Sequence, residues 1–371
     1  MSLKCGDIIN LIEELAHPRH AESWDKIGLQ IGDPATAVNK VLVSLDVTPQ
    51  LVQEAVQEGV DLIVTHHTPF FNPLESIRWD KPLGQIVQKL VQSNINLYCA
   101  HTNLDSVQGG VSDVLADKIG LQDVSVLAPS WQEKYFKVVV FVPWGYEDQV
   151  RSAMGAQGAG HIGNYADCTF QLFGTGTFRP LEGTNPFIGS QGQLEKAEEF
   201  RLETIVPESQ LPGVIEAMKA AHPYEEVAYD VYPLANKFSQ SGLGRIGYLG
   251  EELTLEQLLR RIGGALNTQD LRFVGNKTDK IKKAAVCGGS GASLINAARK
   301  QNADVFITGD IKYHEAQEAQ SMGLALIDAG HFATEFPVVK VVADFLRSRL
   351  AADIKVIESQ VNTNPFEFYK G

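Results

Sequence analysis

The sequence predicts an α/β protein: a discontinuous three-layer α/β domain with a largely parallel sheet, interrupted by a ferredoxin-like α+β domain. Short, continuous hydrophobic runs alternate with helical patterns in the first and last thirds, which is typical of parallel strands covered on both faces. The middle third has a different order of elements. A chain of 371 residues also exceeds what one hydrophobic core usually organises, so we expect at least two domains.

Three hydrophobic runs in the first third are expected to form buried parallel strands. They are Val41–Leu45, Asp61–Val64 and Asn96–Ala100. Between them, Pro49–Glu58 and Pro82–Ser93 carry apolar residues at helical spacing. Because parallel strands need a crossover connection, each helix should join one strand to the next in a βαβ series.

The last third repeats this alternation. Its expected strands are Ala284–Cys287, Asp304–Ile307 and Ala325–Ile327. Its expected helices are Ala292–Lys300, Tyr313–Met322 and Val338–Leu350. The preceding Pro337 is acceptable because proline fits the first turn of a helix. Both terminal thirds therefore indicate α/β structure.

The middle third has the order β-α-β-β-α-β, which is the ferredoxin-like arrangement. Its expected strands are Lys137–Val142, Cys168–Phe173, Arg201–Val206 and Val227–Tyr232. Its expected helices are Glu147–Ala156 and Gln210–Ala221, and the segment Gly174–Gly192 is expected to be a loop. We therefore expect a compact domain at 130–235, inserted into an α/β domain made of 1–129 plus 236–371.

Composition restricts the function classes. A formal net charge of -13 would repel a phosphate backbone, so nucleic acid is an unlikely partner. Cys5, Cys99, Cys168 and Cys287 are scattered, which fits reduced thiols rather than disulfides or a thiolate zinc site. The opening Met1–Lys4 lacks a signal-peptide pattern, and no run reaches the ~18 apolar residues of a membrane span. We expect a cytoplasmic protein with no membrane partner.

Histidines and carboxylates follow three of the predicted strands. These candidate metal ligands are His66, His67, Asp105, His331 and Glu335. In open parallel sheets, ligands bind beyond the carboxyl ends of the strands, so we expect the three strand ends to meet at the same edge. The convergence of five such residues by chance is improbable, and the pattern predicts a metal site.

The spacing of these residues favours two metal ions. Adjacent histidines on an extended backbone diverge, so His66 and His67 serve two ions more easily than one. His331 and Glu335 are spaced i, i+4 and share one face if a helix begins by Phe332. Glu335 is the candidate for a bridge between ions ~3.5–4 Å apart. Mixed imidazole and carboxylate ligands suit zinc, iron or manganese.

Five segments resemble the NIF-three-like family, also labelled GTP cyclohydrolase 1 type 2. They are Glu22–Gln30, Thr65–Pro69, Ala100–Asp105, Asp304–His314 and Asp328–Glu335. The resemblance implies that His66, His67, Asp105, His331 and Glu335 bind a dinuclear centre of zinc or iron. It also implies that the middle domain is similar to the PII-like and CutA-like insert of longer bacterial members. A ring-shaped homohexamer, with metal sites facing an internal cavity, is implied by the same resemblance.

Further residues near these strand ends have two interpretations each. His101, Thr102 and His314 are candidates for proton transfer or for orienting the metal ligands, although His314 can equally begin a helix. Asp310 either lies near the site or caps that helix. The glycine-rich Gly288–Ser293 either holds phosphate or, as we favour, forms a plain tight turn.

Two further groups of residues, one early in the chain and one in the middle domain, also have two interpretations each. Trp24, Asp25 and Gly28 either shape the pocket or serve the core and a turn. In the middle domain, four polar residues either form a second ligand site or, as we favour, close matching loops of a duplicated fold. The residues concerned are His161, His222, Tyr224 and Glu225.

Two functions are compatible with this sequence. The first is a metal-dependent hydrolase in which activated water attacks a nucleotide ring or a phosphoester. A nucleotide or another phosphorylated small molecule would then be the substrate. The second is a non-catalytic hexameric scaffold or regulatory protein that carries metal and binds a ligand.

Overall fold

The computed structural model describes residues 3–236 and 240–367, so Met1 and Ser2 of the opening segment lie outside it. The chain forms two compact units. We call Met1–Trp131 with Ser241–Gly371 the outer unit, and Gln132–Gln240 the inserted unit. Both contain helices and strands, and the prediction of an α/β protein is confirmed.

The outer unit contains a largely parallel first sheet in the order β1-β4-β3-β2-β15. Its strands are β1 (Gly28–Ile31), β2 (Lys40–Ser44), β3 (Leu62–Thr65), β4 (Asn96–Cys99) and β15 (Lys355–Glu358). Only the β1–β4 pair is antiparallel among the pairs of this sheet. Thr65 lies opposite both Ser44 and Cys99, so the carboxyl ends of the three central strands are level.

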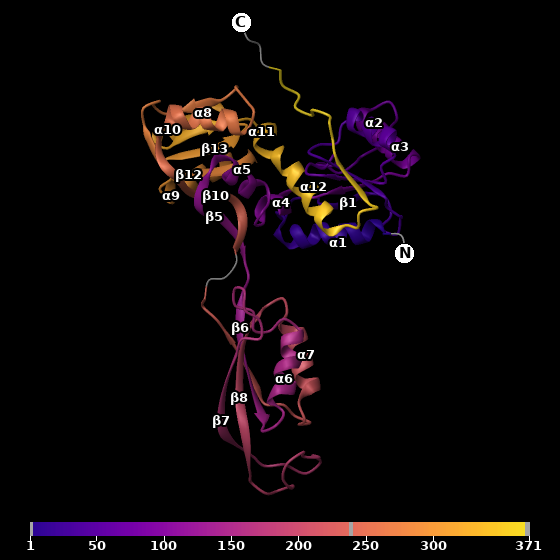
Figure 1. The fold of residues 1–371 in the computed structure, drawn as a ribbon, viewed down its shortest axis with the longest axis vertical. Coiled ribbons are helices and arrows are strands. Elements are labelled where there is room, and N and C mark those ends of the chain that lie inside the picture. The colour runs from indigo at the N-terminus through magenta and orange to yellow at the C-terminus, as the bar shows by residue number, and fades with distance from the viewer. Residues whose placement is uncertain (1–2, 237–239, 368–371) are drawn as a thin grey trace. The chain divides into compact units, whose positions relative to one another are not determined.

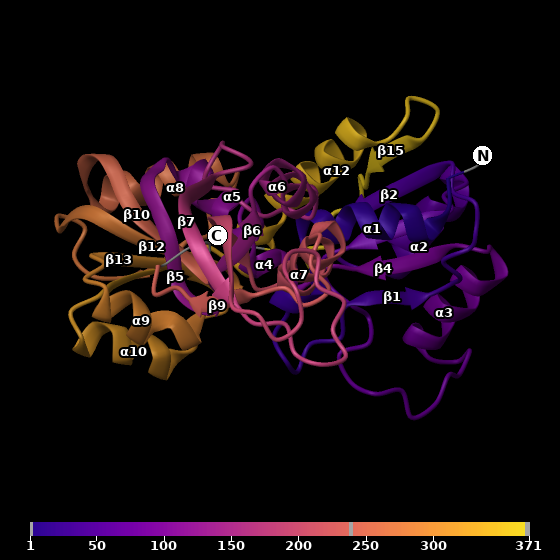
Figure 2. The same ribbon diagram turned by 90° about the horizontal axis from the view of Figure 1, so that it is seen from below.

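Helices cover both faces of the first sheet. The helices α1 (Cys5–Leu15) and α12 (Pro337–Arg349) share one core with Val41 and Val43. The helices α2 (Pro49–Glu58) and α3 (Pro82–Gln92) share the other core with Leu42, the residue between those valines. Figures 1 and 2 show these layers. The central strands are continuous hydrophobic runs in the sequence because helices bury them on both faces.

A second sheet of the outer unit has the order β11-β14-β13-β12-β10-β5. Its strands are β5 (Leu121–Gln132), β10 (Gln240–Thr254), β11 (Arg272–Val274), β12 (Lys280–Ser290), β13 (Val305–Gly309) and β14 (Ala325–Asp328). The pairs β12–β13 and β13–β14 are parallel, whereas β10–β12 and β11–β14 are antiparallel. This sheet is therefore mixed.

The second sheet is also covered on both faces. The helices α5 (Val111–Ile119) and α8 (Leu255–Ala265) pack on one face. The helices α9 (Ile295–Lys300) and α10 (Tyr313–Ser321) pack on the other. The predicted helix Ala292–Lys300 is divided into a 3-10 turn at Ala292–Leu294 and α9. A further 3-10 turn, Pro18–His20, follows α1.

The expectation that three strand ends meet at one edge of one sheet is wrong. β3 and β4 belong to the first sheet and β14 to the second. Three of the predicted residues lie in short helices that follow these strands. Asp105 lies in α4 (Thr102–Ser106) after β4, and His331 and Glu335 lie in α11 (His331–Glu335) after β14. The sequence pattern did not distinguish two short parallel series from one, because hydrophobic runs do not specify which strands pair.

The inserted unit contains β6 (Tyr135–Pro143), α6 (Glu147–Ala156), β7 (Thr169–Phe178), β8 (Glu195–Pro207), α7 (Leu211–Ala221) and β9 (Tyr229–Pro233). Its strand order is β7-β8-β6-β9, with antiparallel pairs throughout. The two helices and the sheet enclose a separate core. Gly174 to Phe178, expected within a loop, instead extends β7, because these residues pair with Glu195 to Glu199 of β8.

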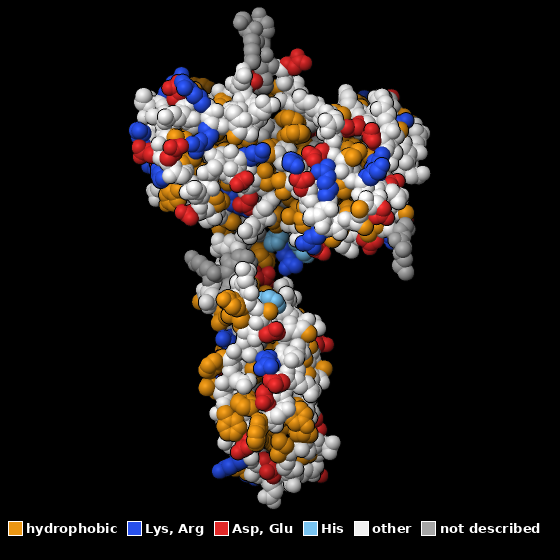
Figure 3. Space-filling view, viewed as in Figure 1, with side chains coloured by type: hydrophobic (Ala, Val, Ile, Leu, Met, Phe, Trp, Pro, Cys, Tyr) orange, Lys and Arg blue, Asp and Glu red, His pale blue; other side chains and the backbone are white. Residues whose placement is uncertain are grey.

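On the face of the outer unit seen in Figure 3, Lys and Arg side chains are interspersed with Asp and Glu rather than gathered into one basic field. In the part of the chain that the structure describes, no helix has the length and apolar character needed to cross a bilayer.

Candidate metal centre

The structure brings the five predicted ligand residues together. His66 and His67 directly follow β3, Asp105 lies in α4, and His331 and Glu335 begin and end α11. The Nε2 atoms of His67 and His331 lie 3.1 and 3.0 Å from Glu335 Oε2. Both are also close to each other, at 3.3 Å. The i, i+4 spacing of α11 therefore places His331 and Glu335 on one face, as expected.

A second grouping shares the same glutamate. His66 Nε2 lies 3.5 Å from Asp105 Oδ1 and 3.8 Å from Glu335 Oε1. Glu335 thus belongs to both His67–His331–Glu335 and His66–Asp105–Glu335, each a group that could hold a metal ion. Two donors bound to one tetrahedral ion at 2.0–2.1 Å lie about 3.4 Å apart, which is comparable with these separations.

Unpartnered polar atoms at the centre test whether a metal ion fits. Among the described residues, His66 Nε2, Asp105 Oδ1 and Glu335 Oε2 are buried without a hydrogen-bond partner. A buried polar atom without a partner is costly, and a divalent cation would satisfy all three. The side chains of His66 and Glu335 are only 1% and 5% exposed, so water reaches them poorly. The donor set fits a metal ion.

Outer contacts orient the three imidazoles. The Nδ1 atom of His66 donates to the carbonyl oxygen of Ala100 at 2.9 Å. His67 Nδ1 is bound by Asp46 at 2.7 Å and His331 Nδ1 by Asp310 at 2.6 Å. Each ring therefore presents Nε2 to the centre, as metal-binding histidines do when a carboxylate or carbonyl holds the other nitrogen.

The charges of the cluster are strongly coupled. Burial alone lowers the pKa of His67 and His331, but the neighbouring carboxylates outweigh it and raise these values to about 10 and about 9. Burial would raise the pKa of Glu335, yet the three adjacent imidazoles, His331, His66 and His67, hold it well below its usual range. For Asp105, burial dominates and raises the pKa. In the metal-free chain, His67, His331 and Asp105 therefore hold their protons more tightly than isolated groups do.

Glycines allow the second sheet to approach Glu335. A Cβ atom on Gly289 would lie 2.0 Å from Glu335 Oε1, and one on Gly309 would lie 2.7 Å from the His331 backbone nitrogen. Gly289 also has a left-handed φ of +60°, which favours glycine. This support was missed in the sequence, although the run Gly288–Gly291 was its signal.

The glycine-rich segment has internal partners for its N–H groups. The Gly289 N–H donates to Thr334 Oγ1 at 3.0 Å and the Gly291 N–H to Thr308 Oγ1 at 2.9 Å. The favoured interpretation of a plain tight turn is wrong, because Gly288 to Ser290 end strand β12 with an irregular register against β13, and a 3-10 turn begins only at Ala292. This end of β12 also positions Glu335.

His101 lies beside the cluster, whereas His314 makes other contacts. The His101 ring centroid is 5.1 Å from that of His66 and 5.5 Å from that of His67. His314 is exposed in the first turn of α10, where it contacts Gln317 and Tyr313.

Asp25 and Asp310 each contact a histidine at or beside the cluster, His101 and His331 respectively. Asp25 binds His101 Nδ1 through both oxygens at 3.0 Å and also accepts the N–H of Thr102. Burial would raise the Asp25 pKa, but these hydrogen bonds lower it well below its usual range. The residue before α10 is Lys312, so the alternative of Asp310 as its cap is wrong, and Asp310 lies near the site. Trp24 is largely exposed, with its ring edge-on to His101.

The candidates in the inserted unit take part in loop contacts. His222 Nε2 donates to the Phe141 carbonyl oxygen at 2.9 Å, and Glu225 accepts the N–H of Asn185. Tyr224 donates its hydroxyl to Glu199, and His161 contacts the Gly158 carbonyl oxygen. Within 3–236 and 240–367, every group of residues that could hold a metal lies in the outer unit.

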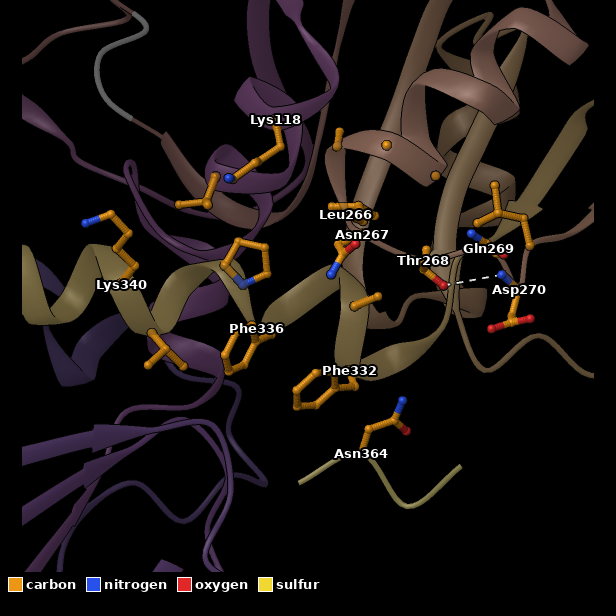
Figure 4. Close-up of a pocket in the computed structure, with 18 of the residues that line it drawn as sticks. Lys118, Leu266, Asn267, Thr268, Gln269, Asp270, Phe332, Phe336, Lys340 and Asn364 are labelled. Carbon is orange, nitrogen blue, oxygen red and sulfur yellow. Dashed lines mark hydrogen bonds between the residues drawn. The ribbon is translucent and has the colours of Figure 1, made fainter. Parts of the chain in front are cut away.

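The helix α11 also borders a wide groove of about 1790 Å³ (Figure 4). Phe332 and Phe336 stack on each other, with centroids 4.8 Å apart, and line this groove, whereas His331 and Glu335 belong to the cluster. The groove and the metal centre therefore use different sides of the same short helix.

Comparisons with known proteins show the family of this chain. The family model of Duf34/NIF3 (NGG1p interacting factor 3) matches residues 3–365. A Halalkalibacterium halodurans protein named GTP cyclohydrolase 1 type 2 homolog is 45% identical, over 97% of this chain and 98% of its own length. A Bacillus subtilis protein of the same name is 42% identical, over 99% of each chain.

A solved structure is similar over the same extent. The crystal structure of a Bacillus cereus protein related to NIF3 has a TM-score of 0.88 and 46% identity, covering 99% of both chains. Fold and sequence therefore point to one family, and this chain belongs to the Duf34/NIF3 family.

Proposed function

We propose that the protein is a metal-dependent hydrolase whose outer unit binds two divalent ions through His66, His67, Asp105, His331 and Glu335. The observation that carries this proposal is the place of Glu335, which lies in two of the three groups of described residues that could hold a metal ion; the third consists of His66, His67 and His101. A carboxylate in that position can bridge two ions. Zinc or iron suits the three imidazoles and two carboxylates best, and manganese is also acceptable.

Two bound ions would polarise the substrate and lower the pKa of a water molecule towards ~7. The residues of this chain have separate roles around that chemistry. Glu335 and Asp105 would supply the carboxylate ligands, and Asp46 and Asp310 keep two imidazoles oriented. Of the two candidates for proton transfer, His101 lies at the cluster and His314 does not contact it among the described residues. We assign proton transfer to His101.

The substrate is proposed to be a nucleotide or another phosphorylated small molecule. Relatives with up to 45% identity are named GTP cyclohydrolase 1 type 2 homologs. In that chemistry, water attacks a ring carbon of a purine, whereas in a phosphoester the same centre would support in-line attack. Both reactions need an activated water beside a buried, oriented donor set.

We further propose that residues 1–129 plus 236–371 form the metal domain and that 130–235 form a ferredoxin-like, PII-like and CutA-like domain. The element order and the strand order β7-β8-β6-β9 support the ferredoxin-like assignment. A ring-shaped homohexamer remains part of the same proposal. The alternative function is a non-catalytic, metal-bearing scaffold or regulatory protein.

Turnover separates these two functions. The full chain, reconstituted with zinc or with iron, should convert at least one member of a panel of purine nucleotides and phosphoesters. The His66→Ala variant should lose that turnover by at least about 100-fold, because a metal ligand is removed. If none of these compounds is converted and His66→Ala instead alters the assembly of the protein, the hydrolase proposal is contradicted and the scaffold function is favoured.

A further inference from the structure

We propose that Asp25 is a positioning residue that fixes the His101 imidazole with Nε2 directed at the metal centre. The inference rests on the proposed function, because it gives His101 the tautomer needed for proton exchange there. Asp25 lies in the loop before β1, and His101 precedes α4, so the pair joins two segments 76 residues apart.

The carboxylate of Asp25 is more fully engaged than a turn would require. Its two oxygens lie 3.0 Å from His101 Nδ1, and Oδ2 also accepts the Thr102 N–H at 3.0 Å and the Thr102 hydroxyl at 2.5 Å. The side chain is 1% exposed. Thr102 in turn accepts the N–H of Glu22, which fastens the loop. A carboxylate can only accept a hydrogen bond, so Nδ1 of His101 carries the proton and donates it in this bond, which leaves Nε2 for the centre.

The group to which His101 belongs differs from those of the other proposed residues. The five proposed ligands have donor atoms 3.0–3.8 Å from a neighbouring donor, and each of their two groups that share Glu335 contains a carboxylate. His101 groups with His66 and His67, and no carboxylate joins these three imidazoles. We therefore assign His101 to proton exchange with a water molecule at the centre.

Asp46 provides a matched comparison within the same site. Asp46 holds His67 as Asp25 holds His101, through Nδ1 and a carboxylate. His67, however, also contacts Glu335 at 3.1 Å. Each aspartate thus holds an imidazole by Nδ1, Asp46 through one oxygen and Asp25 through both, but their predicted roles differ: Asp46 supports a metal ligand, and Asp25 supports a proton-transfer group.

The test uses the full chain loaded with zinc and labelled with 15N-histidine. The chain has nine histidines, so two-bond proton–nitrogen spectra can be assigned, with His101→Gln identifying the His101 signals. In the wild type, His101 should be protonated at Nδ1 and not at Nε2. Asp25→Asn should populate the Nε2-protonated tautomer, because the amide can donate to Nδ1. Elemental analysis of the same sample should give wild-type zinc content.

Asp46→Asn should behave differently, with zinc affinity lowered by about 10- to 100-fold. An Nε2-protonated His101 in the wild type would overturn the proposal whether or not Asp25→Asn folds. Equal zinc loss in Asp25→Asn and Asp46→Asn would also overturn it, because His101 would then be a ligand. If the wild type binds no zinc, the proposed function fails, while the tautomer of His101 in the metal-free chain still tests the role of Asp25.

Discussion

Glu335 shows how much of the site depends on single residues. Its carboxylate is buried, lies against three imidazoles and belongs to two of the three groups of described residues that could hold a metal ion. The carboxylate can occupy this position because the facing residue, Gly289, has no side chain. Small and charged residues therefore act together, and substitutions on either side should affect metal binding.

Gly289→Ala should weaken metal binding without removing a ligand. The added methyl group would lie 2.0 Å from Glu335 Oε1 and would displace the carboxylate. We expect a loss in zinc affinity of about 10- to 100-fold, as for other changes that misplace a ligand. Competition with a chromogenic chelator measures this value.

Gly59→Ala is the control for the backbone cost of that change. Gly59 has a similar φ of +64°, but a Cβ atom there would meet nothing within 4 Å. Both variants should lose about 1 kcal/mol or more of stability from strain. Only Gly289→Ala should lose zinc affinity. Equal zinc affinity in both variants would contradict the proposed effect of a Gly289 side chain on Glu335.

The stability of the metal-free protein should depend on pH through His67 and His331. Their pKa values rise from 6.5 to about 10 and about 9 on folding. The raised values mean that folding favours the protonated rings, so the contribution is fully present below pH 6.5 and is lost as the pH rises through 9–10. Urea unfolding of the metal-free protein at pH 7 and pH 10 measures this loss. The His67→Gln variant should show a smaller loss, and an equal one would contradict the assignment.

Among single residues, the sequence predicted that His66, His67, Asp105, His331 and Glu335 lie together, and the structure brings them together. That they bind metal stays a prediction. Asp46 supports His67 from another part of the chain. Such a partner has no local signal, because the contact exists only after folding. The support from Gly289 had a signal in the glycine run, but the sequence did not show which residue it would face.

At the scale of elements, the junction between β10 and α4 supports Asp105. Arg245 of β10 is 3% exposed and forms a two-point ion pair with Asp113 at 2.8 and 3.0 Å. The same guanidinium donates to the carbonyl oxygens of Ser106 and Val107, at the end of α4. It also donates to Gly242 and Gly244. One buried side chain thus joins the second sheet to the helix that carries Asp105.

Arg245→Met should be strongly destabilising. The variant leaves the Asp113 carboxylate and several carbonyl groups without their donor, and breaking one partner of a buried pair costs about 3–5 kcal/mol. The free energy of urea unfolding measures the effect. Arg260→Met provides the control, because the Arg260–Glu256 pair is exposed and should contribute less than about 1 kcal/mol. Similar losses in the two variants would contradict a special role for Arg245.

The elements that the sequence predicted well are those with strong hydrophobic patterns. The helix Pro49–Glu58 has its predicted bounds as α2, where Thr48 accepts the Leu51 N–H and Gly59 ends the helix in a left-handed conformation. The five-residue helices α4 and α11 are too short for periodicity to reveal. Most residues of β5 are exposed or half-buried, so this strand lacked a hydrophobic signal.

At the scale of the whole molecule, the proposed metal centre depends on two separate sheets of the outer unit. The residues His66, His67 and Asp105 follow strands of the first sheet, and His331 and Glu335 follow a strand of the second. The α/β class was predictable because both sheets are covered on both faces. The pairing into two sheets was not, because it depends on contacts between distant segments.

The inserted unit should be dispensable for metal binding. Every proposed ligand, and every Nδ1 partner of the imidazoles, lies in the outer unit. Replacement of Gln132–Gln240 by a short Gly-Ser linker should therefore leave the metal content per chain unchanged. Elemental analysis of the folded deletion variant tests this. A folded variant with no metal would show that the inserted unit contributes to the site.

The proposed dinuclear centre depends on Glu335, the buried glutamate that belongs to two groups that could each hold a metal ion. The most direct test is elemental analysis of the purified wild type beside Glu335→Ala, both dialysed against the same zinc or iron buffer. We expect about two ions per wild-type chain and a clear loss in the variant, which should remain folded by circular dichroism. Equal metal content in the two proteins would contradict the role of Glu335 and, with it, the proposed dinuclear centre.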